Sequence, residues 1–335
     1  HALHIYGHDI TVAHCAFSDI GASAIHISAE STGTACYEPT YNITIADNII
    51  NNYGVVFPAG KGIIVGRAHD ILVTHNSVSD GGNVGIQMGG GGTTDLQYNN
   101  TVTYNDVSNV CNLMHDASGI YGGGTQTNSV FSYNKVHDIK AARSPIYDDP
   151  GGYGRGLYLD ESCDNIVVEN NWVYRVPWGM LFHLTENNIL RNNVFADITG
   201  FRFVSFSGSN DQVTQNIYYN TREITYLYKS PVGLLDYNLF YNIDNSFQTT
   251  WDAMIDNIQA QGFELHSMRQ DPLFVDFQND NFNLRANSPA FALGFEDFDM
   301  SNVGPRAKYH PGEPDGPLEK IKPEKTELTC CNNVF

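Results

Sequence analysis

Hydrophobic and polar positions form a short pattern that recurs along the chain, each time centred on an asparagine. In every copy an apolar residue stands three positions before this asparagine, and another stands two positions after it. The eight asparagines are Asn48, Asn76, Asn105, Asn134, Asn170, Asn193, Asn216 and Asn238. The preceding apolar residues are Ile45, Val73, Val102, Phe131, Val167, Leu190, Val213 and Leu235, and the following ones are Ile50, Val78, Val107, Val136, Trp172, Phe195, Tyr218 and Phe240. This regularity indicates a structural repeat.

The repeat units are 28, 29, 29, 36, 23, 23 and 22 residues long, counted from one asparagine to the next. Each holds short β-branched runs broken by Asn, Asp and Gly, without a helical period. The units lack the LxxLxL skeleton of leucine-rich repeats and are too short for propeller blades. The pattern therefore predicts an all-β fold, a single-stranded right-handed parallel β-helix with three short strands per coil over residues 1–245. We expect the asparagines to stack as one internal ladder.

Both ends of such a solenoid expose unpaired strand edges and need a cover. The repeat stops after residue 245, so residues 246–335 are predicted to form a C-terminal cap and an extended tail. At the other end the chain opens with HALHIYGHDITV, which already resembles the middle of an element, without an initiator Met or a signal peptide. We therefore expect an upstream segment or a second chain to complete the N-terminal end.

One strand of each coil carries the candidate chemistry. Residues 119–123, 156–160 and 179–183 align as GIYGG, GLYLD and GMLFH. Because side chains alternate on a strand, Tyr121, Tyr158, Asp160 and His183 are expected on the outer face, with coils about 4.8 Å apart. Glycines at 89–92 and 122–124 remove side chains beside Asp160, and glycine in a strand often marks the close approach of a ligand. Tyrosine rings can stack on sugars, so this face is predicted to bind a carbohydrate chain.

Two further groups of polar residues flank this face. The stretch CNLMHDASGIY places His115 and Asp116 at the start of the Tyr121 strand, one coil below Asp160. The longest unit contains the insertion KAARSPIYDDPGGYGRG, and long insertions on one face of a solenoid often build the site. The insertion carries the candidate substrate-binding residues Arg143, Asp148, Asp149 and Arg155. Simple turn formation accounts for the two aspartates equally well.

Charge narrows the range of partners. The chain has 37 acidic and 18 basic residues, and its net charge of −19 without a basic cluster argues against nucleic acid and against a membrane surface. The sequence contains no apolar run of 18 residues, the length needed to span a bilayer. The six cysteines lack zinc-site spacing and are expected mainly as buried thiols. Glycosylation acceptors at Asn42 and Asn99 fit a secreted, extracellular protein.

The stretch HDASGIY, followed one coil later by RGLYLDESCDNIVVENNWVY, resembles the secreted right-handed β-helix glycoside hydrolases, a group with xylan-degrading enzymes and fucosidases. The closing segment at 271–306 is similar to the end of such proteins, so the resemblance covers about residues 40–306. It implies two catalytic carboxylates, which correspond here to Asp116 and Asp160, with Glu161 as a substitute.

The resemblance also implies acid/base cleavage of a glycosidic bond. We expect Asp160 to be the acid, with its pKa raised by Glu161 and by partial burial, and Asp116 to be the nucleophile or base; the reverse assignment stays open. His183, Tyr121 and Arg143 are expected to position the sugar. This chemistry needs neither a metal nor a cofactor.

Two other functions fit the same residues. A polysaccharide lyase or epimerase would recognise uronate polymers through Arg67, Arg143 or Arg155, with or without Ca²⁺. A non-catalytic carbohydrate-binding or structural β-helix protein would bind a glycan without turnover.

Overall fold

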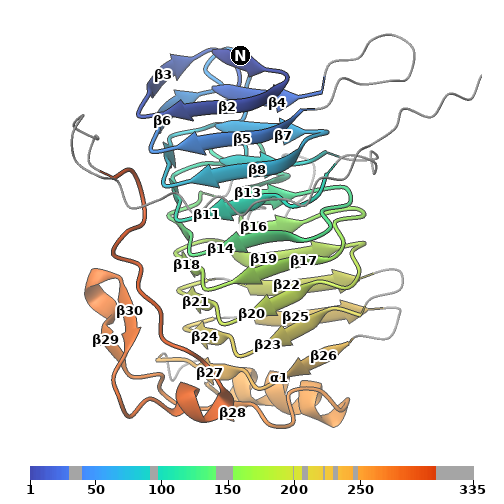
Figure 1. Ribbon diagram of the computed structural model, residues 1–335. Helices are drawn as coiled ribbons and strands as arrows, with labels where there is room; N and C mark the ends of the chain where they lie inside the picture. Colours follow the sequence, from blue (N-terminus) through green and yellow to red (C-terminus); the bar gives the residue numbers. More distant parts are fainter. Residues whose placement is uncertain are drawn as a thin grey trace, which may run out of the picture.

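The computed structural model describes residues 1–29, 40–90, 97–140, 154–198, 200–205, 210–221, 223–228, 233–243 and 248–306. Its strands form three parallel sheets that run the length of a solenoid (Figure 1). We name them sheets A, B and C, in the order in which a coil visits them. Each coil contributes one strand to each sheet, which confirms the predicted β-helix with three strands per coil.

The strand bounds follow in spatial order. Sheet A contains β1 (Leu3–Ile5), β4 (Ile25–Ser28), β7 (Ile63–Gly66), β10 (Ile86–Met88), β13 (Ala117–Gly122), β16 (Gly154–Leu159), β19 (Trp178–His183), β22 (Gly200–Ser205) and β25 (Glu223–Tyr228). Sheet B contains β2 (His8–Ala13), β5 (Tyr41–Ala46), β8 (His69–Thr74), β11 (Thr101–Thr103), β14 (Ser129–Ser132), β17 (Ile166–Glu169), β20 (Ile189–Arg191), β23 (Gln212–Thr214) and β26 (Leu234–Asp236). Sheet C contains β3 (Ala16–Ile20), β6 (Ile49–Tyr53), β9 (Ser77–Ser79), β12 (Asp106–Ser108), β15 (Lys135–His137), β18 (Trp172–Tyr174), β21 (Val194–Ala196), β24 (Ile217–Tyr219), β27 (Leu239–Tyr241) and β28 (Met268–Arg269).

The predicted asparagine ladder lies at the bend between sheets B and C, and one of its members was assigned wrongly. Asn171, not Asn170, is the buried ladder residue of this coil. Asn134 Nδ2 donates to Asn171 Oδ1 at 3.0 Å, and Asn171 Nδ2 donates to Asn193 Oδ1 at 2.9 Å. The remaining seven predicted asparagines are all fully buried. Each backbone N–H and side-chain amide in the ladder therefore finds a partner away from water.

The same one-residue error affects the predicted core. Phe195 and Val136 are buried as expected, but Val167 is only half-buried and Val168 takes the interior position. Val168 pairs in register with Phe131 and with Leu190, which belong to the inward column. A shift of one residue on a strand exchanges the inner and outer faces, so Val173 is likewise interior, whereas Trp172 packs on the outside of sheet C.

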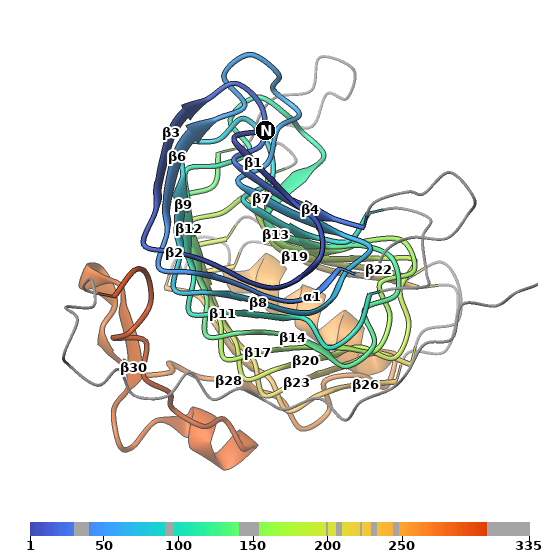
Figure 2. The same ribbon diagram turned by 45° about the horizontal axis from the view of Figure 1, so that its top comes forward.

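The C-terminal end of the solenoid is covered by helix α1 (Gln248–Ala260), drawn beneath the last coils in Figure 1. Ile255 and Ile258 of this helix are buried in the same hydrophobic cluster as the coil interior. Figure 2 shows the three sheets around that interior, with α1 beyond the coils. At the other end, β1, β2 and β3 form the edges of the three sheets, and completion by a further segment or chain stays a prediction.

Beyond α1, residues 271–306 form a strap that returns along the outer face of sheet C (Figure 1). The strap contains an antiparallel pair, β29 (Phe274–Asp276) and β30 (Asn281–Leu284), and two short 3₁₀ turns, η2 (Phe277–Asn279) and η3 (Pro289–Leu293). Trp172 and Tyr174 of sheet C pack edge-to-face on Phe282 of the strap. The outward aromatic residues of sheet C are therefore explained by the segment that covers them.

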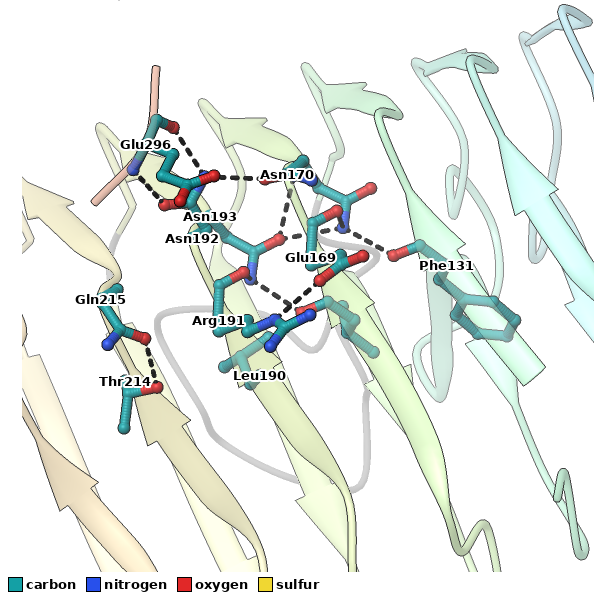
Figure 3. Close-up of polar contacts among 12 residues, drawn as sticks. Phe131, Glu169, Asn170, Leu190, Arg191, Asn192, Asn193, Thr214, Gln215 and Glu296 are labelled. Atoms are coloured by element: carbon teal, nitrogen blue, oxygen red, sulfur yellow. Dashed lines mark hydrogen bonds and ion pairs between the residues drawn. The ribbon is translucent and has the colours of Figure 1, made fainter. Parts of the chain in front are cut away.

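Polar contacts fix the strap at several coils. Asn192 and Glu296 exchange two hydrogen bonds of 2.7 Å, and Asn192 Nδ2 also bonds Asn170 (Figure 3). At the far end, Arg306 Nη2 lies 2.6 Å from Asp47 Oδ2, and the Asp47 side chain is only 3% exposed. Burial raises the pKa of Asp47, but hydrogen bonds from Arg306 outweigh this effect and hold the pKa below its usual value.

Candidate functional site

Asp160 follows β16 on the outer face of sheet A and receives hydrogen bonds from two neighbouring coils. Tyr121 Oη of β13 donates to its Oδ2 at 2.8 Å, and His183 Nδ1 of β19 lies 2.6 Å from its Oδ1. The side chains of Asp160 and His183 are 18% and 30% exposed, so the pair is sheltered and still reaches solvent. The sequence prediction that these three residues share one outer face is met by this geometry.

Register explains why Tyr121 and Asp160 meet. Tyr121 of β13 pairs with Tyr158 of β16. Asp160, two residues after Tyr158, is therefore opposite Gly123, two residues after Tyr121. A Cβ on Gly123 would lie 2.8 Å from Tyr121 Cε1. The Tyr121 ring therefore lies over this glycine, and its hydroxyl reaches Asp160. Burial and the nearby Asp160 carboxylate raise the pKa of Tyr121 well above its usual value, so its hydroxyl remains a donor.

The charge state of Asp160 differs from the expectation for a catalytic acid. Burial raises its pKa, but hydrogen bonds from His183, from Tyr121, from the Glu161 backbone and from Tyr158 together hold the pKa below its usual value. The prediction that Glu161 raises the pKa of Asp160 is wrong. The Glu161 side chain is exposed, and its backbone N–H stabilises the ionised form of Asp160. Asp160 is therefore a carboxylate anion at neutral pH.

A second carboxylate, Asp116, is held by a buried arginine. Arg155 Nη1 donates to Asp116 Oδ1 at 2.9 Å; the arginine side chain is 6% exposed, and that of Asp116 is 66% exposed. The guanidinium carbon lies 4.4 Å from the Tyr158 ring centre and 5.4 Å from that of Trp178. Stacking on aromatic faces and pairing with a carboxylate make burial of this cation tolerable.

Asp116 lies in the coil that precedes Asp160, as predicted, but it is not opposite Asp160 in the strand register. Ala117 pairs with Gly154 and Gly122 with Leu159, so Asp116 and Asp160 are at opposite ends of their strands, seven register positions apart. Side chains span part of this gap, because Arg155 joins Asp116 to the Tyr158 ring and Tyr158 hydrogen-bonds to Asp160. The two carboxylates thus flank a patch formed by Tyr121, Tyr158 and Trp178, in which Tyr158 is only 4% exposed and does not present the open sugar-stacking face predicted for it.

Two of the glycines beside Asp160, Gly89 and Gly122, have internal causes in addition to the predicted ligand approach. A Cβ on Gly89 would lie 1.9 Å from the carbonyl oxygen of Gly123, and Gly89 also has a positive φ of 79°. A Cβ on Gly122 would meet the buried Cys163 sulfur at 2.9 Å. Close packing between coils therefore requires these glycines.

The remaining predicted site residues add little to this geometry. His115 is half-buried one residue before Asp116. Arg143, Asp148 and Asp149 lie outside the described residues. Within the described ranges, no group of three or more His, Cys, Asp or Glu side chains could hold a metal ion. Among the same residues, no helix is long and apolar enough to cross a membrane.

Trp178 is the site residue that sequence reasoning missed. It opens β19 and pairs in register with Arg155. The available signal was its position two residues before the Met180 column, on the strand that ends in His183. A half-exposed Trp at the start of an outward strand is unusual enough to indicate a ligand-facing or cation-stacking role.

Comparison with solved structures finds distant matches to carbohydrate-active proteins. No curated protein matches the chain. A solved "Glycoside hydrolase" is 24% identical with a TM-score of 0.49, and the match covers 55% of this chain and 32% of that one. A complex of XylC with xylose is 12% identical (TM-score 0.38, covering 66% and 37%), and a mutant of the periplasmic alginate epimerase AlgG is 15% identical (TM-score 0.37, covering 66% and 54%). The chain thus spans between about a third and about half of the length of these structures.

The family model gives the firmer assignment, because it covers more than half of the chain. The model described as "Right handed beta helix region" matches residues 1–177, which include β1 to β18 and both candidate carboxylates. The chain belongs to the right-handed β-helix family.

Proposed function

We propose that the outer face of sheet A binds a glycan and hydrolyses a glycosidic bond, with the Asp160–His183 pair as the reacting groups and Asp116 as a binding residue at the opposite end of the patch. The observation that carries this proposal is the Asp160 anion, which is held between Tyr121 and His183 at the edge of an aromatic patch. A fixed carboxylate and a histidine can serve as acid/base groups, and the partly exposed rings of Tyr121 and Trp178 can pack on a sugar.

The pKa of Asp160 changes the roles expected from sequence. Because the Asp160 carboxylate is ionised and its Oδ1 lies 2.6 Å from His183 Nδ1, it is suited to orient the His183 ring. Protonated His183 then gives its proton to the leaving glycosidic oxygen as the C–O bond breaks. A water molecule then attacks the anomeric carbon and returns a proton to His183, while Asp116, seven register positions away, binds the sugar chain at the other end of the patch.

The test is turnover by the purified protein on a panel of chromogenic glycosides and plant and bacterial polysaccharides. On any substrate found, Asp160→Asn and His183→Gln should each lower kcat at least about 100-fold, the scale of a lost general acid or base, whereas Asp116→Asn should mainly raise KM. The circular dichroism spectrum should not change. Near-normal turnover of Asp160→Asn would place the chemistry elsewhere.

Glu161→Gln is the matched control for the Asp160 variant. It removes a carboxylate from the adjacent exposed residue and keeps the backbone N–H that bonds Asp160. We expect this variant to retain most of the activity. A loss as large as that of Asp160→Asn would restore Glu161 as a catalytic residue.

A second candidate is proton abstraction from a uronate sugar, as in lyases and epimerases. The combination of His183 and Tyr121 around Asp160 favours it, because a base and an acid on one face suit removal and return of a proton. A lyase would release an unsaturated product that absorbs in the near ultraviolet, and an epimerase would exchange the sugar C–H proton with heavy water. Either result would replace the hydrolase proposal.

Binding without turnover would favour a third reading, a non-catalytic carbohydrate-binding protein, and a glycan array run beside the activity panel detects it. Action outside the cell is also a proposal. The sequons at Asn42 and Asn99 support it, and a secretion assay on the full-length protein in its own host tests it.

A further inference from the structure

Arg155 and Tyr158 were both expected to bind substrate, but almost no part of either side chain reaches solvent. Both residues belong to β16, and they are 6% and 4% exposed. The Arg155 guanidinium lies against the Tyr158 ring, with its carbon 4.4 Å from the ring centre. The two side chains therefore form a buried pair, and the question is what this pair does for the site.

We propose that Arg155 and Tyr158 are positioning residues: the Arg155 cation holds the Tyr158 ring so that its hydroxyl donates to Asp160, and this contact keeps the Asp160 carboxylate ionised and directed at His183. The inference rests on the hydrolase function proposed above, in which the Asp160–His183 pair reacts. Neither Arg155 nor Tyr158 touches the glycan.

The geometry fixes the Tyr158 hydroxyl beside Asp160. The two residues are two positions apart on one chain segment, so their side chains leave the same face of the sheet. The Tyr158 side chain hydrogen-bonds to Asp160. Tyr121 of the neighbouring coil packs edge-to-face on the Tyr158 ring, with ring centres 5.1 Å apart and an interplanar angle of 85°. The ring is thus held by a cation and by a second ring, and the direction of its hydroxyl is set by both.

The charge of Arg155 also strengthens the hydrogen bond. Burial raises the pKa of Tyr158 well above its usual value, and the nearby Arg155 charge opposes this increase. The hydroxyl therefore keeps its proton, while the cation polarises it toward the Asp160 anion. In a region sheltered from water, hydrogen bonds and charges that polarise one another are stronger than in solvent.

Asp116 makes the arrangement testable. It pairs with Arg155 Nη1 at 2.9 Å, which offsets the cost of burying the cation. The Asp116 side chain is mostly exposed, so removal of Arg155 leaves its carboxylate in contact with water. Arg155 can therefore be replaced by an uncharged residue without leaving a buried charge unpaired.

The decisive experiment measures the pKa of Asp160 in the full chain without substrate, by carbon-13 NMR of the aspartate carboxyl groups. Asp160→Asn identifies the resonance. Arg155→Met should raise this pKa, because a weaker donor favours the ionised form less, and Tyr158→Phe should raise it more, because the donor is gone. In the Tyr158→Phe background, Arg155→Met should have almost no further effect, since the hydroxyl through which it acts is missing.

Kinetics on the best substrate found give the second readout. Tyr158→Phe keeps the ring and the Arg155–Asp116 pair, so it should lower kcat about 10-fold and leave KM within about twofold. The acidic limb of the kcat profile should move to higher pH in this variant and in Arg155→Met, in the same order as the pKa of Asp160.

Arg175→Met is the matched control. Arg175 also lies over a tyrosine ring, that of Tyr174 at 4.6 Å, but on sheet C. This change should leave the pKa of Asp160 and the acidic limb where they are in the parent protein. If Arg155→Met does not fold, Arg155→Gln also lacks the charge and provides the same comparison.

The outcomes separate the possibilities. An unchanged pKa of Asp160 in Arg155→Met and Tyr158→Phe would overturn the proposal. Equal increases on changing Arg155 in both backgrounds would show that the cation acts on Asp160 directly and not through the hydroxyl. A raised KM with kcat unchanged in Tyr158→Phe would show that Tyr158 binds the glycan, which also overturns the proposal. Because the titration needs no turnover, failure to find a substrate would contradict the hydrolase function alone.

Discussion

Four hydrogen-bond donors, two of them on neighbouring coils, determine the ionisation of Asp160. Tyr121 contributes the hydroxyl at 2.8 Å, and this contact can be removed without changing the shape of the ring. Tyr121→Phe should raise the pKa of Asp160, because the lost bond favoured the ionised form. The acidic limb of the pH–rate profile should therefore move to higher pH, while activity near neutrality changes less.

Tyr133→Phe provides the control for that measurement. Tyr133 also lies outside the coil interior, stacked on Tyr104 on the other side of the solenoid. Its removal should not shift the profile. An unchanged acidic limb in Tyr121→Phe would show that Asp160 does not govern this limb.

Individual residues show how much of the candidate site could be predicted from the sequence. Alternation along β13, β16 and β19 was enough to place Tyr121, Asp160 and His183 together, because strand register is the same in neighbouring coils. The direction of the Asp160 pKa shift could not be predicted. It depends on hydroxyl and imidazole groups that reach across coils, and side-chain directions of this kind are not encoded in spacing.

At the scale of the repeat element, the asparagine pair 170–171 shows the limit of pattern reading. Both positions hold Asn, and the alignment chose the first. The structure gives Asn170 the left-handed bend, with φ +56°, and Asn171 the buried ladder position. Asn tolerates left-handed φ, so both residues suit both roles and sequence alone cannot distinguish them.

The two asparagines should differ sharply in stability. Asn171→Ala leaves the buried backbone N–H of Asn134 without its acceptor, whereas Asn134 Nδ2 keeps the carbonyl oxygens of Val102 and Ser132. At about 1–3 kcal/mol for a buried unsatisfied group, the free energy of unfolding should fall by about 1–3 kcal/mol. Asn170→Gly keeps the left-handed bend and should cost less than about 1 kcal/mol. Urea unfolding followed by circular dichroism measures both, and equal losses would contradict the ladder assignment.

Helix α1 and the strap were beyond the reach of the repeat pattern, since neither repeats. The pattern did indicate that coils end near residue 245, but not that a helix follows. Trp172 was wrongly predicted to be a core residue for a related reason. Its side chain points outward and packs on Phe282, which lies more than a hundred positions later in the sequence. Apolar residues on an outer face become interpretable only when the covering segment is known.

At the scale of the whole molecule, stability depends on pH through His137. Burial lowers the pKa of His137, but Asp106 at 2.9 Å and Asp138 at 2.7 Å raise it above 6.5 overall. Asp138 also bonds Arg175, which reaches Asp280 in the strap. A histidine whose folded pKa is raised stabilises the native state fully below the unfolded pKa of about 6.5, and this contribution is lost as pH rises through the folded value.

His137→Gln should therefore reduce stability at pH 6 and have little effect at alkaline pH. Urea-unfolding midpoints of both proteins across this range provide the measurement. Parallel curves for variant and parent would show that His137 is not the titrating group.

The asparagine ladder also has an electrical direction. Each side-chain amide accepts at Oδ1 from the coil on its N-terminal side and donates from Nδ2 to the coil on its C-terminal side. The amide dipoles of successive coils therefore add, as peptide dipoles do along an α-helix, and the positive end lies at the last coil. There Asn238 Nδ2 donates to both carboxylate oxygens of Glu264, at 3.1 and 3.0 Å, and this residue is fully buried. The solenoid thus ends in an anion site built from its own side chains, and a coil inserted after Asn238 would keep that site only if it carried an asparagine at the same bend.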